Sequence, residues 1–202
     1  MFHGKPVIGI TGGIGSGKST VAQMFGDLHC LVISSDEQVN QAYRDPAIIQ
    51  QLCSWWGDAI VRPDGQVDRI RIADIIFSDP SQRLKLEGLL HPKVEQLRQG
   101  LMLGAADDPQ VPAIVWDTPL LFETGLYRQC DAIVFVEAPL PQRLRRVQQT
   151  RGWTQQELTR RENSQWPLDK KREISDYIVD NTADAEFVRS QLRDVLFRII
   201  SN

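Results

Sequence analysis

The residues whose spacing most clearly predicts chemistry lie between Gly12 and Ser19. Gly12, four intervening residues, and then Gly17, Lys18 and Ser19 match the pattern G-x-x-x-x-G-K-[ST]. In this pattern the backbone N–H groups surround phosphate oxygens, and side chains at the glycine positions would block that approach. The lysine reaches the β- and γ-phosphates, and the serine hydroxyl is offered to Mg²⁺. The spacing therefore predicts a site for the phosphates of a nucleotide.

The segments on either side of this loop favour the same interpretation. Val7 to Ile10 is an apolar run expected to form a buried strand, and apolar residues keep helical spacing after the loop at Val21, Ala22, Met24, Phe25 and Leu28. A helix in this position directs the positive end of its dipole at the bound phosphate. This context disfavours the alternative of a glycine-rich turn that only joins a strand to a helix.

Asp36 is the candidate general base. The run Cys30 to Ser34 is expected to form a second strand, and Ser35 with Gln38 makes a capping-box pattern that opens a helix. Asp36 then lies in the first turn of that helix, at the end of a strand, where open parallel sheets bind their ligands. From there it could deprotonate an acceptor hydroxyl. The alternative is a carboxylate that only stabilises the helix N-terminus.

Two further polar residues are candidates with open alternatives. Asp117 follows the apolar run Ala113 to Trp116, and from there it could hold Mg²⁺ through water. Capping of the loop before Thr118 and Pro119 explains this aspartate equally well. His91 precedes a proline at an expected helix junction, where it either contacts substrate or packs near a helix start.

The composition favours a single soluble domain. The chain has 202 residues, of which 42% are hydrophobic, and its net charge is −3. That charge gives no general reason to bind nucleic acid or an anionic membrane, and no apolar run approaches the length of a membrane span. The early first strand leaves no room for a leader segment, so we expect a cytoplasmic protein, as a monomer or a weak homo-oligomer. The three cysteines are far apart and are expected to be reduced thiols.

The charge is unevenly distributed along the chain. Residues 140–172 contain nine basic residues and three acidic ones, a local charge of +6, which leaves −9 for the remainder. In a chain with a phosphate-binding loop, such a segment is expected to clamp a small polyanion. The alternative is a solvated helix face, which is the more common role of a run of charges.

The order of the expected elements defines the fold class. Strands are expected near residues 7–10, 30–34, 113–116, 132–136 and 177–179, and helices connect them. Residues 45–106 are almost wholly helical in pattern, with starts at Asp45-Pro46 and Asp79-Pro80 and one interrupting turn at Arg62–Gly65. Thr154 with Glu157 opens a later helix, and an amphipathic helix ends the chain. This alternation predicts an α/β fold with a mainly parallel sheet and a helical insertion.

Several separated motifs, taken in order, resemble the dephospho-coenzyme A kinase family over nearly the whole chain. The stretch Gly9–Thr20, GITGGIGSGKST, is similar to the phosphate-binding loop of that family. Leu89–Pro92 is similar to its LLHP motif, and Asp117–Glu123, DTPLLFE, to its DxPLLFE motif. Where the family has D-x-D after the second strand, this chain has Ser34-Ser35-Asp36, so only the second acidic position is kept. The order of Arg145 or Arg146, Arg161, Gln165, Lys171, Ser175, Asp176, Val179 and Asn181 fits the arginine-containing lid and the segment after it.

The resemblance implies a P-loop NTPase fold of three layers, with a parallel five-stranded sheet, a helical substrate-binding insertion and a small helical lid. Within one domain, 1–202, the nucleotide-binding core would comprise 1–45, 107–140 and 175–202, the acceptor-binding insertion 46–106, and the basic lid 141–174. The implied reaction is phosphorylation of the ribose 3′-hydroxyl of dephospho-coenzyme A by ATP, with Mg²⁺. No nucleic acid or membrane partner is implied.

The same resemblance implies roles for individual residues. Catalysis is assigned to Asp36 as base, to Lys18, and to Arg145 or Arg146 as the lid arginine that bridges the phosphates. ATP binding is assigned to Gly13, Gly15, Ser16, Gly17, Lys18, Ser19, Thr20, Arg161 and Asn181. Acceptor binding is assigned to Asp36, His91, Leu120, Glu123 and Gln165, and metal binding to Ser19 and Asp117.

The phosphate-binding loop by itself leaves other functions open. A kinase for another small hydroxyl acceptor, such as a nucleoside, a nucleotide or a shikimate-like compound, would carry the same loop. A GTP-binding switch is a different class, but the chain lacks an N-K-x-D motif that would read guanine. A regulatory nucleotide-binding module without turnover is the third alternative, and the presence of Asp36, Lys18 and Ser19 disfavours it.

Overall fold

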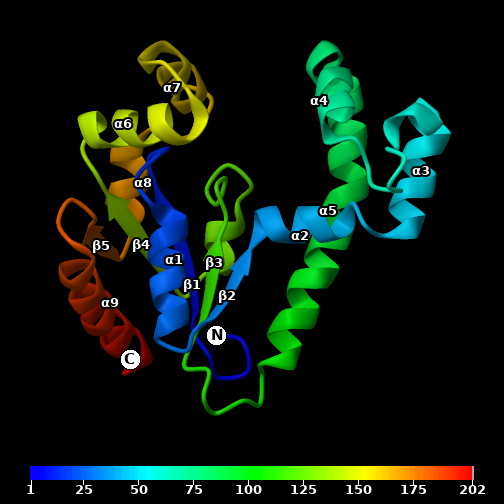
Figure 1. Cartoon of the computed structure of the whole chain (residues 1–202). Coiled ribbons are helices and arrows are strands. Elements are labelled where there is room, and N and C mark those ends of the chain that lie inside the picture. The colour runs from blue at the N-terminus through cyan, green and yellow to red at the C-terminus, as the bar shows by residue number, and fades with distance from the viewer. Residues whose placement is uncertain (202) are drawn as a thin grey trace. The chain divides into compact units, whose positions relative to one another are not determined.

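The computed structural model describes residues 1–201 and divides them into two compact units. The first unit contains Met1–Ser34 and the chain from Met102 onwards, and the second contains Ser35–Leu101. Figure 1 shows the strands gathered in the first unit, whereas the second is built from helices. Each unit has its own apolar core, so each is described separately.

The first unit is built on a five-stranded parallel sheet, which confirms the expected fold class. Its strands are β1 (Val7–Gly12), β2 (Leu31–Ser34), β3 (Ile114–Asp117), β4 (Ala132–Glu137) and β5 (Tyr177–Asp180), and their order in the sheet is β2-β3-β1-β4-β5. All four strand pairs are parallel. Because β1 lies at the centre, the loop that follows it opens at the carboxyl edge of the sheet, where such folds bind ligands.

Side chains alternate between the two faces of the sheet, as parallel strands covered on both sides require. Ile8 and Ile10 of β1 pack with helices α1 (Lys18–Asp27) and α9 (Ala185–Ile200), which lie side by side in Figure 1. Val7 packs on the opposite face, against the segment that contains Leu121 and Phe122. The central strand is therefore sandwiched, which holds the loop after it on a rigid base.

The basic segment forms three short helices. They are α6 (Leu140–Arg151), α7 (Gln155–Glu162) and α8 (Leu168–Ile174). Thr154 caps α7 by accepting from the Glu157 N–H, as expected, but the Glu157 carboxylate turns to Arg160 and Arg161 instead of closing the capping box. A short 3₁₀ helix, η2 (Leu126–Gln129), precedes β4.

The second unit has four helices around a separate core. They are α2 (Ser35–Ala42), α3 (Pro46–Trp56), α4 (Arg69–Ser78) and α5 (Pro80–Gly104), with a 3₁₀ turn η1 (Asp58–Ile60) after α3. The expected start of α3 is confirmed, because the Asp45 side chain accepts from the Ala47 N–H. The sequence analysis did not separate α4, which begins after a second cap at Asp68.

Two local expectations in this unit were wrong. His91 and Pro92 lie inside the continuous helix α5 and not at a junction. The missing N–H of Pro92 frees the Gly88 carbonyl, but both residues are on the exposed side, where water can bind that oxygen. The Ser35–Gln38 capping box also fails, because the Gln38 side chain is buried and makes no hydrogen bond within residues 1–201.

Candidate active site

The candidate site in the first unit is the loop Gly12–Lys18, which connects β1 to α1. Gly17 has φ 94° and stands at the N-cap of α1, and Gly15 has φ 78°. Both are left-handed conformations that favour glycine. A Cβ at Gly15 would also lie 2.7 Å from the Arg143 carbonyl oxygen, so α6 is packed directly against the loop. These glycines therefore set both the curvature of the loop and the close approach of α6.

Lys18 begins α1 and turns its ammonium back over the loop. Its Nζ donates to the carbonyl oxygens of Gly13 at 2.9 Å and Gly12 at 3.1 Å. Burial, together with repulsion from the Lys171 ammonium, lowers the pKa of Lys18 to about 8, and the Asp117 and Glu162 carboxylates oppose that shift. The surroundings of Lys18 neutralise its positive charge only in part, so a bound phosphate group would interact with the ammonium strongly.

Asn181 and Arg146 hold the loop from outside through its backbone carbonyl groups, and Arg146 Nη1 also donates to the Gly15 carbonyl at 3.3 Å. The Ser16 carbonyl oxygen accepts from Asn181 Nδ2 at 2.7 Å and from Arg146 Nη1 at 2.9 Å. Arg146 also donates to the Asn181 carbonyl at 3.1 Å, which joins the two residues to each other. Both had been assigned to the site from sequence, and in the structure both contact the loop backbone.

Arg143 was missed as a site residue by the sequence analysis, although it was counted in the basic segment. Its guanidinium is buried and donates to the carbonyl oxygens of Ala138 and Ile14, and it pairs with the Glu162 carboxylate. That carboxylate also accepts from the Ile14 N–H at 3.1 Å. The spacing of Arg143 and Arg146 by three residues on α6, which places them on one helix face, was the available signal.

The two candidate metal ligands lie at the carboxyl edge of the sheet and at the start of α1. Asp117 ends β3, is 8% exposed, and pairs in register with Ile10 of β1 and Ser34 of β2. Its carboxylate interacts electrostatically with Lys18. Ser19, like the neighbouring Thr20, is exposed at the beginning of α1. Within residues 1–201 no group of three or more His, Cys, Asp or Glu could hold a metal ion by itself.

The segment after Asp117 is tied to helix α8 by a buried ion pair. Lys171 is 1% exposed, and its Nζ lies 2.7 Å from a Glu123 carboxylate oxygen and 3.2 Å from the Gln165 side-chain oxygen. Glu123 also accepts from the Trp166 N–H. Glu123 and Gln165, both assigned to acceptor binding from sequence, are thus brought together around Lys171, while Leu120 is 38% exposed.

The remaining arginines assigned to the site lie farther out on the helices. Arg145 is exposed on α6. Arg161 donates to Glu157 at 2.6 Å and stacks over the Trp153 ring at 4.2 Å from its centroid. Hydrogen bonds from Arg160 and Arg161 lower the pKa of Glu157 to about 2, so this cluster stays ionised near neutral pH.

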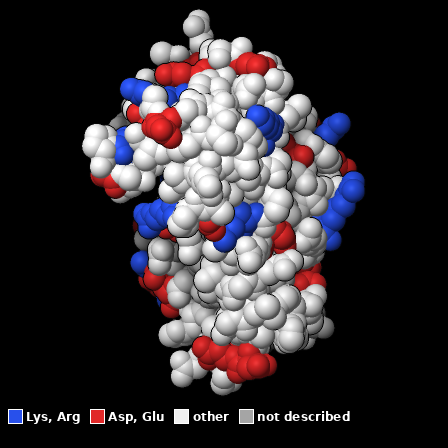
Figure 2. Space-filling model, turned by 90° about the vertical axis from the view of Figure 1, so that its right-hand side faces the viewer, with Lys and Arg blue, Asp and Glu red and all other residues white. Residues whose placement is uncertain are grey.

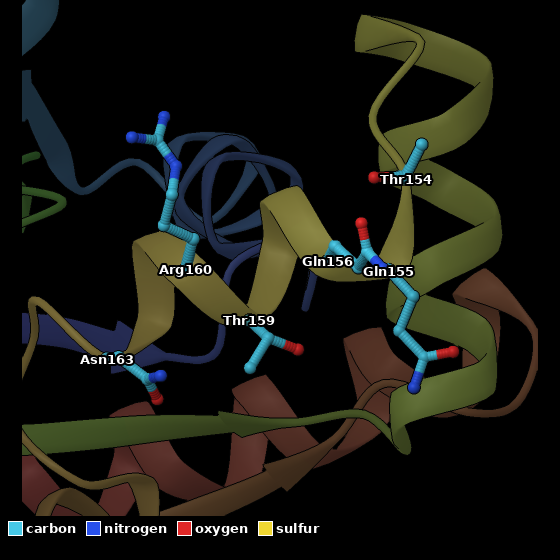
Figure 3. A pocket seen from close by; sticks show the side chains of 6 residues that line it. All are labelled: Thr154, Gln155, Gln156, Thr159, Arg160 and Asn163. Atoms are coloured by element: carbon cyan, nitrogen blue, oxygen red, sulfur yellow. The ribbon is translucent and has the colours of Figure 1, made fainter.

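A polar groove of about 760 Å³ runs along α7 and shares no residue with the loop (Figure 3). Thr159 and Asn163 project from one side of the helix, whereas Arg160 projects to the other side. A smaller cavity of about 200 Å³ does reach the loop, since Gly13 and Arg143 line it together with residues of β4 and α8. Of these two cavities, the smaller one therefore adjoins the loop.

Asp36 and His91 belong to the second unit. Asp36 lies in the first turn of α2, directly after β2, as the sequence predicts, and its side chain is exposed. His91 is exposed on α5.

No helix within the described residues is long and apolar enough to cross a membrane.

Comparison with known proteins gives one consistent result. A family model described as dephospho-CoA kinase matches residues 6–186. The dephospho-CoA kinase of Thermobifida fusca is 32% identical over 190 residues, which cover 93% of each chain. A crystal structure from Thermus thermophilus is 33% identical, covers 96% of this chain and 97% of its own, and has a TM-score of 0.81. A dephospho-CoA kinase structure from Campylobacter jejuni has a TM-score of 0.69 at 20% identity, covers 98% of this chain and all of its own, and shares the fold.

Proposed function

Because this chain belongs to the dephospho-CoA kinase family, we propose that it phosphorylates the ribose 3′-hydroxyl of dephospho-CoA with ATP. A bond forms between the 3′-oxygen and the γ-phosphorus, the bond from that phosphorus to the β–γ bridging oxygen breaks, and ADP leaves. The hydroxyl proton passes to a base. The products are coenzyme A and ADP.

The observation that carries this proposal is the extent of the family match. It spans residues 6–186 and therefore includes the phosphate-binding loop, Asp36, the segment Asp117–Glu123 and the basic helices. A match limited to the loop would support nucleotide binding alone, because that loop is shared by kinases, switches and motors. The match over most of the chain favours this acceptor over a nucleoside, nucleotide or shikimate-like acceptor.

The loop residues would bind the donor. Gly13 and Gly15–Thr20 surround the phosphates with backbone N–H groups, and Lys18 exchanges its contacts with loop carbonyls for contacts with phosphate oxygens. Arg146 and Asn181 fix the loop from outside. Their role is to keep the N–H groups oriented before ATP arrives, so that little ordering is needed on binding.

The oxygen donors near the loop fit Mg²⁺. Ser19 offers a hydroxyl at the start of α1, and Asp117 offers a buried carboxylate at the end of β3. Two protein oxygens are enough, because Mg²⁺ at kinase sites takes its other ligands from phosphates and water. When bound, the ion supplies positive charge that offsets the negative charge developing on the phosphates.

Asp36 is proposed as the base that accepts the proton of the 3′-hydroxyl. Its exposed carboxylate in the first turn of α2 is accessible to an acceptor. His91 and Leu120 are proposed to contact the acceptor, while Glu123 and Gln165 would act through Lys171, which they hold. Arg145 and Arg161 are proposed to meet the phosphates after lid movement.

We further propose that the insertion, residues 46–106, holds the acceptor and that residues 141–174 form a lid over ATP. Closure of such a lid would exclude water, which otherwise competes as the acceptor. A cytoplasmic monomer or weak homo-oligomer is proposed as the working state. Size-exclusion chromatography with light scattering would test the oligomeric part.

A panel of acceptors tests the proposed function. Purified protein would be incubated with ATP, Mg²⁺ and one acceptor at a time: dephospho-CoA, adenosine, a nucleoside monophosphate, shikimate or gluconate. We expect ADP formation with dephospho-CoA and a product carrying a 3′-phosphate by phosphorus NMR. No turnover with dephospho-CoA, or faster turnover with another acceptor, would contradict the proposal. Competition by GTP against ATP would test the switch alternative.

A further inference from the structure

A cavity in the second unit is lined by three arginines. It has a volume of about 350 Å³, lies between the end of α2 and the segment that leads into α4, and is lined by Asn40, Tyr43, Arg44, Arg62, Gln66, Val67, Asp68, Arg69 and Ile70. On the face of the molecule shown in Figure 2, basic side chains likewise form small groups among acidic and uncharged residues. Such a local group suits a small anion better than an extended polyanion.

Arg69 is held in position by one residue of α2 and one in the turn that follows it. Its Nη1 donates to the Asn40 side-chain oxygen, and its guanidinium lies over the Tyr43 ring, 5.5 Å from the centroid. The ring of Tyr43 is buried, so this support is rigid. A guanidinium has five N–H donors, and the hydrogen bond to Asn40 uses one of them. Arg69 can therefore present the others in a fixed direction.

The other charges around the cavity leave it positive. The guanidinium of Arg44 makes no hydrogen bond or ion pair within residues 1–201. Arg62 lies 3.5 Å from Asp64, but both side chains are about half exposed, so that pair is weak. The Asp68 carboxylate is engaged by the N–H groups of Ile70 and Arg71 at the start of α4. An anion entering the cavity would meet arginine donors that lack a strong acceptor.

The cavity lies on the same helix face as the proposed base. Asp36 and Asn40 are spaced by four residues, which places them on one face of α2, and Asn40 lines the cavity. Arg44 follows in the turn after the helix, where its N–H donates to the Gln41 carbonyl. The helical rise of 1.5 Å per residue separates Asp36 from Asn40 by about 6 Å along the axis. A ligand held by the arginines would thus have its neighbouring atoms near the carboxylate.

We infer that this cavity binds the diphosphate group of the acceptor, with Arg44 and Arg69 as its principal contacts. The inference rests on the proposed function, since dephospho-CoA carries a 5′-diphosphate next to the ribose that is phosphorylated. With the diphosphate at the arginines, the ribose would lie along the face of α2 that carries Asn40 and Asp36. The arginines are positioning residues: they select an acceptor with a diphosphate ester and fix its hydroxyl group beside the base.

Binding measurements separate this inference from the proposed function. The phosphate-binding loop would first be saturated with a non-hydrolysable ATP analogue and Mg²⁺, and dephospho-CoA binding would then be measured by calorimetry. Adenosine, which lacks the diphosphate, would be measured by its competition with dephospho-CoA. The variants are Arg44→Gln and Arg69→Gln, and the control is Arg83→Gln, an exposed arginine of the same unit that does not line the cavity.

Each arginine variant should weaken dephospho-CoA binding about tenfold, because a charge-assisted contact to the diphosphate is lost. Adenosine and ATP affinities should stay unchanged, and Arg83→Gln should behave as the unaltered protein does. The inference would be overturned if the arginine variants bound dephospho-CoA with unchanged affinity, or if they lost as much affinity for adenosine. Turnover of dephospho-CoA would then still support the kinase function. If dephospho-CoA binding depends on the arginines but no turnover occurs, the proposed function is contradicted, whereas the inferred binding site is supported.

Discussion

The Glu162 carboxylate accepts a hydrogen bond of 3.1 Å from the backbone N–H of Ile14, so the last residue of α7 places a negative charge against the phosphate-binding loop. Arg143 pairs with the same carboxylate and also donates to the Ile14 carbonyl. The amide that Glu162 engages belongs to the backbone that is proposed to bind phosphate. In the free protein α7 thus places a carboxylate beside the loop to which the phosphates of ATP are proposed to bind.

Replacing Glu162 should affect ATP binding and stability in opposite directions. We expect Glu162→Gln to raise ATP affinity about three- to tenfold, because a carboxylate no longer repels the phosphates. Stability should fall by about 1–3 kcal/mol, because the buried Arg143 loses its charged partner. Calorimetry and urea unfolding measure the two effects. Glu186→Gln, an exposed carboxylate on α9, is the control, and weaker ATP binding in Glu162→Gln would contradict this account.

The pKa of Lys18 predicts how ATP binding depends on pH. Burial holds this pKa at about 8, and phosphate oxygens in contact with the ammonium should raise it. Above about pH 8 the Lys18 amine of the free protein is neutral, and it must take up a proton when ATP binds. ATP affinity should therefore fall as the pH rises through about 8. Calorimetry at pH 8.5 in buffers of different ionisation enthalpy should show proton uptake.

In the free protein, Lys18 should make the free energy of unfolding rise with pH, which is the opposite of the trend in ATP affinity. Between pH 8 and 10.5 the unfolded chain holds a proton on Lys18 that the folded protein has lost, so this lysine contributes a rise in stability with pH over that window. Lys18→Met should remove that rise and also the proton uptake on ATP binding. A proton uptake that persists in Lys18→Met would show that another group titrates.

The strands and the phosphate-binding loop were predictable because they depend on local pattern. Buried parallel strands give continuous apolar runs, and the loop has an obligatory glycine and lysine spacing. The loop supports were only partly predictable. Asn181 and Arg146 were identified by resemblance, but Arg143 and Glu162 make a contact across 19 residues that no short pattern encodes.

The errors in the second unit also have physical causes. A proline usually marks a helix boundary. Pro92 nevertheless lies inside α5, where the Gly88 carbonyl that it leaves unpaired is on the exposed helix face and can bind water. The start of α4 was missed because its cap, Asp68, follows the Arg62–Gly65 turn so closely that the sequence pattern shows one interruption and not a turn followed by a new helix. The arginine cavity joins α2 to residues more than twenty positions later, so spacing along the sequence gave no signal for it.

Asp36→Asn tests the proposed base. The exposed side chain can be replaced with little change in packing, and the lost interaction with the helix dipole should cost only about 0.3–1 kcal/mol. We expect kcat to fall at least about 100-fold while ATP affinity stays near its original value, because proton transfer and donor binding use different residues. Steady-state kinetics and calorimetry measure both quantities. Glu37→Gln, the next carboxylate in the same turn, is the control, and near-normal kcat in Asp36→Asn would show that Asp36 acts only on the helix.

The ion pair of Lys171 with Glu123 is expected to connect the stability of α8 to the titration of Lys18 in the loop. Lys171→Met leaves the Glu123 carboxylate buried without its charged partner, which should cost about 3 kcal/mol. Adding Glu123→Gln should recover part of that loss, and the four proteins form a double-mutant cycle measured by urea unfolding. Lys170→Met, an exposed neighbour, is the control.

The same substitution should also move the pH dependence of ATP binding. Repulsion from the Lys171 ammonium helps to lower the pKa of Lys18, so Lys171→Met should raise that pKa above about 8. The decline of ATP affinity with pH would then shift to higher pH, whereas Glu123→Gln alone, which leaves the Lys171 charge uncompensated, should shift it to lower pH. Opposite shifts from the two partners are a signature that general destabilisation would not produce. Shifts in one direction, or none, would mean that the two lysines do not interact through the loop.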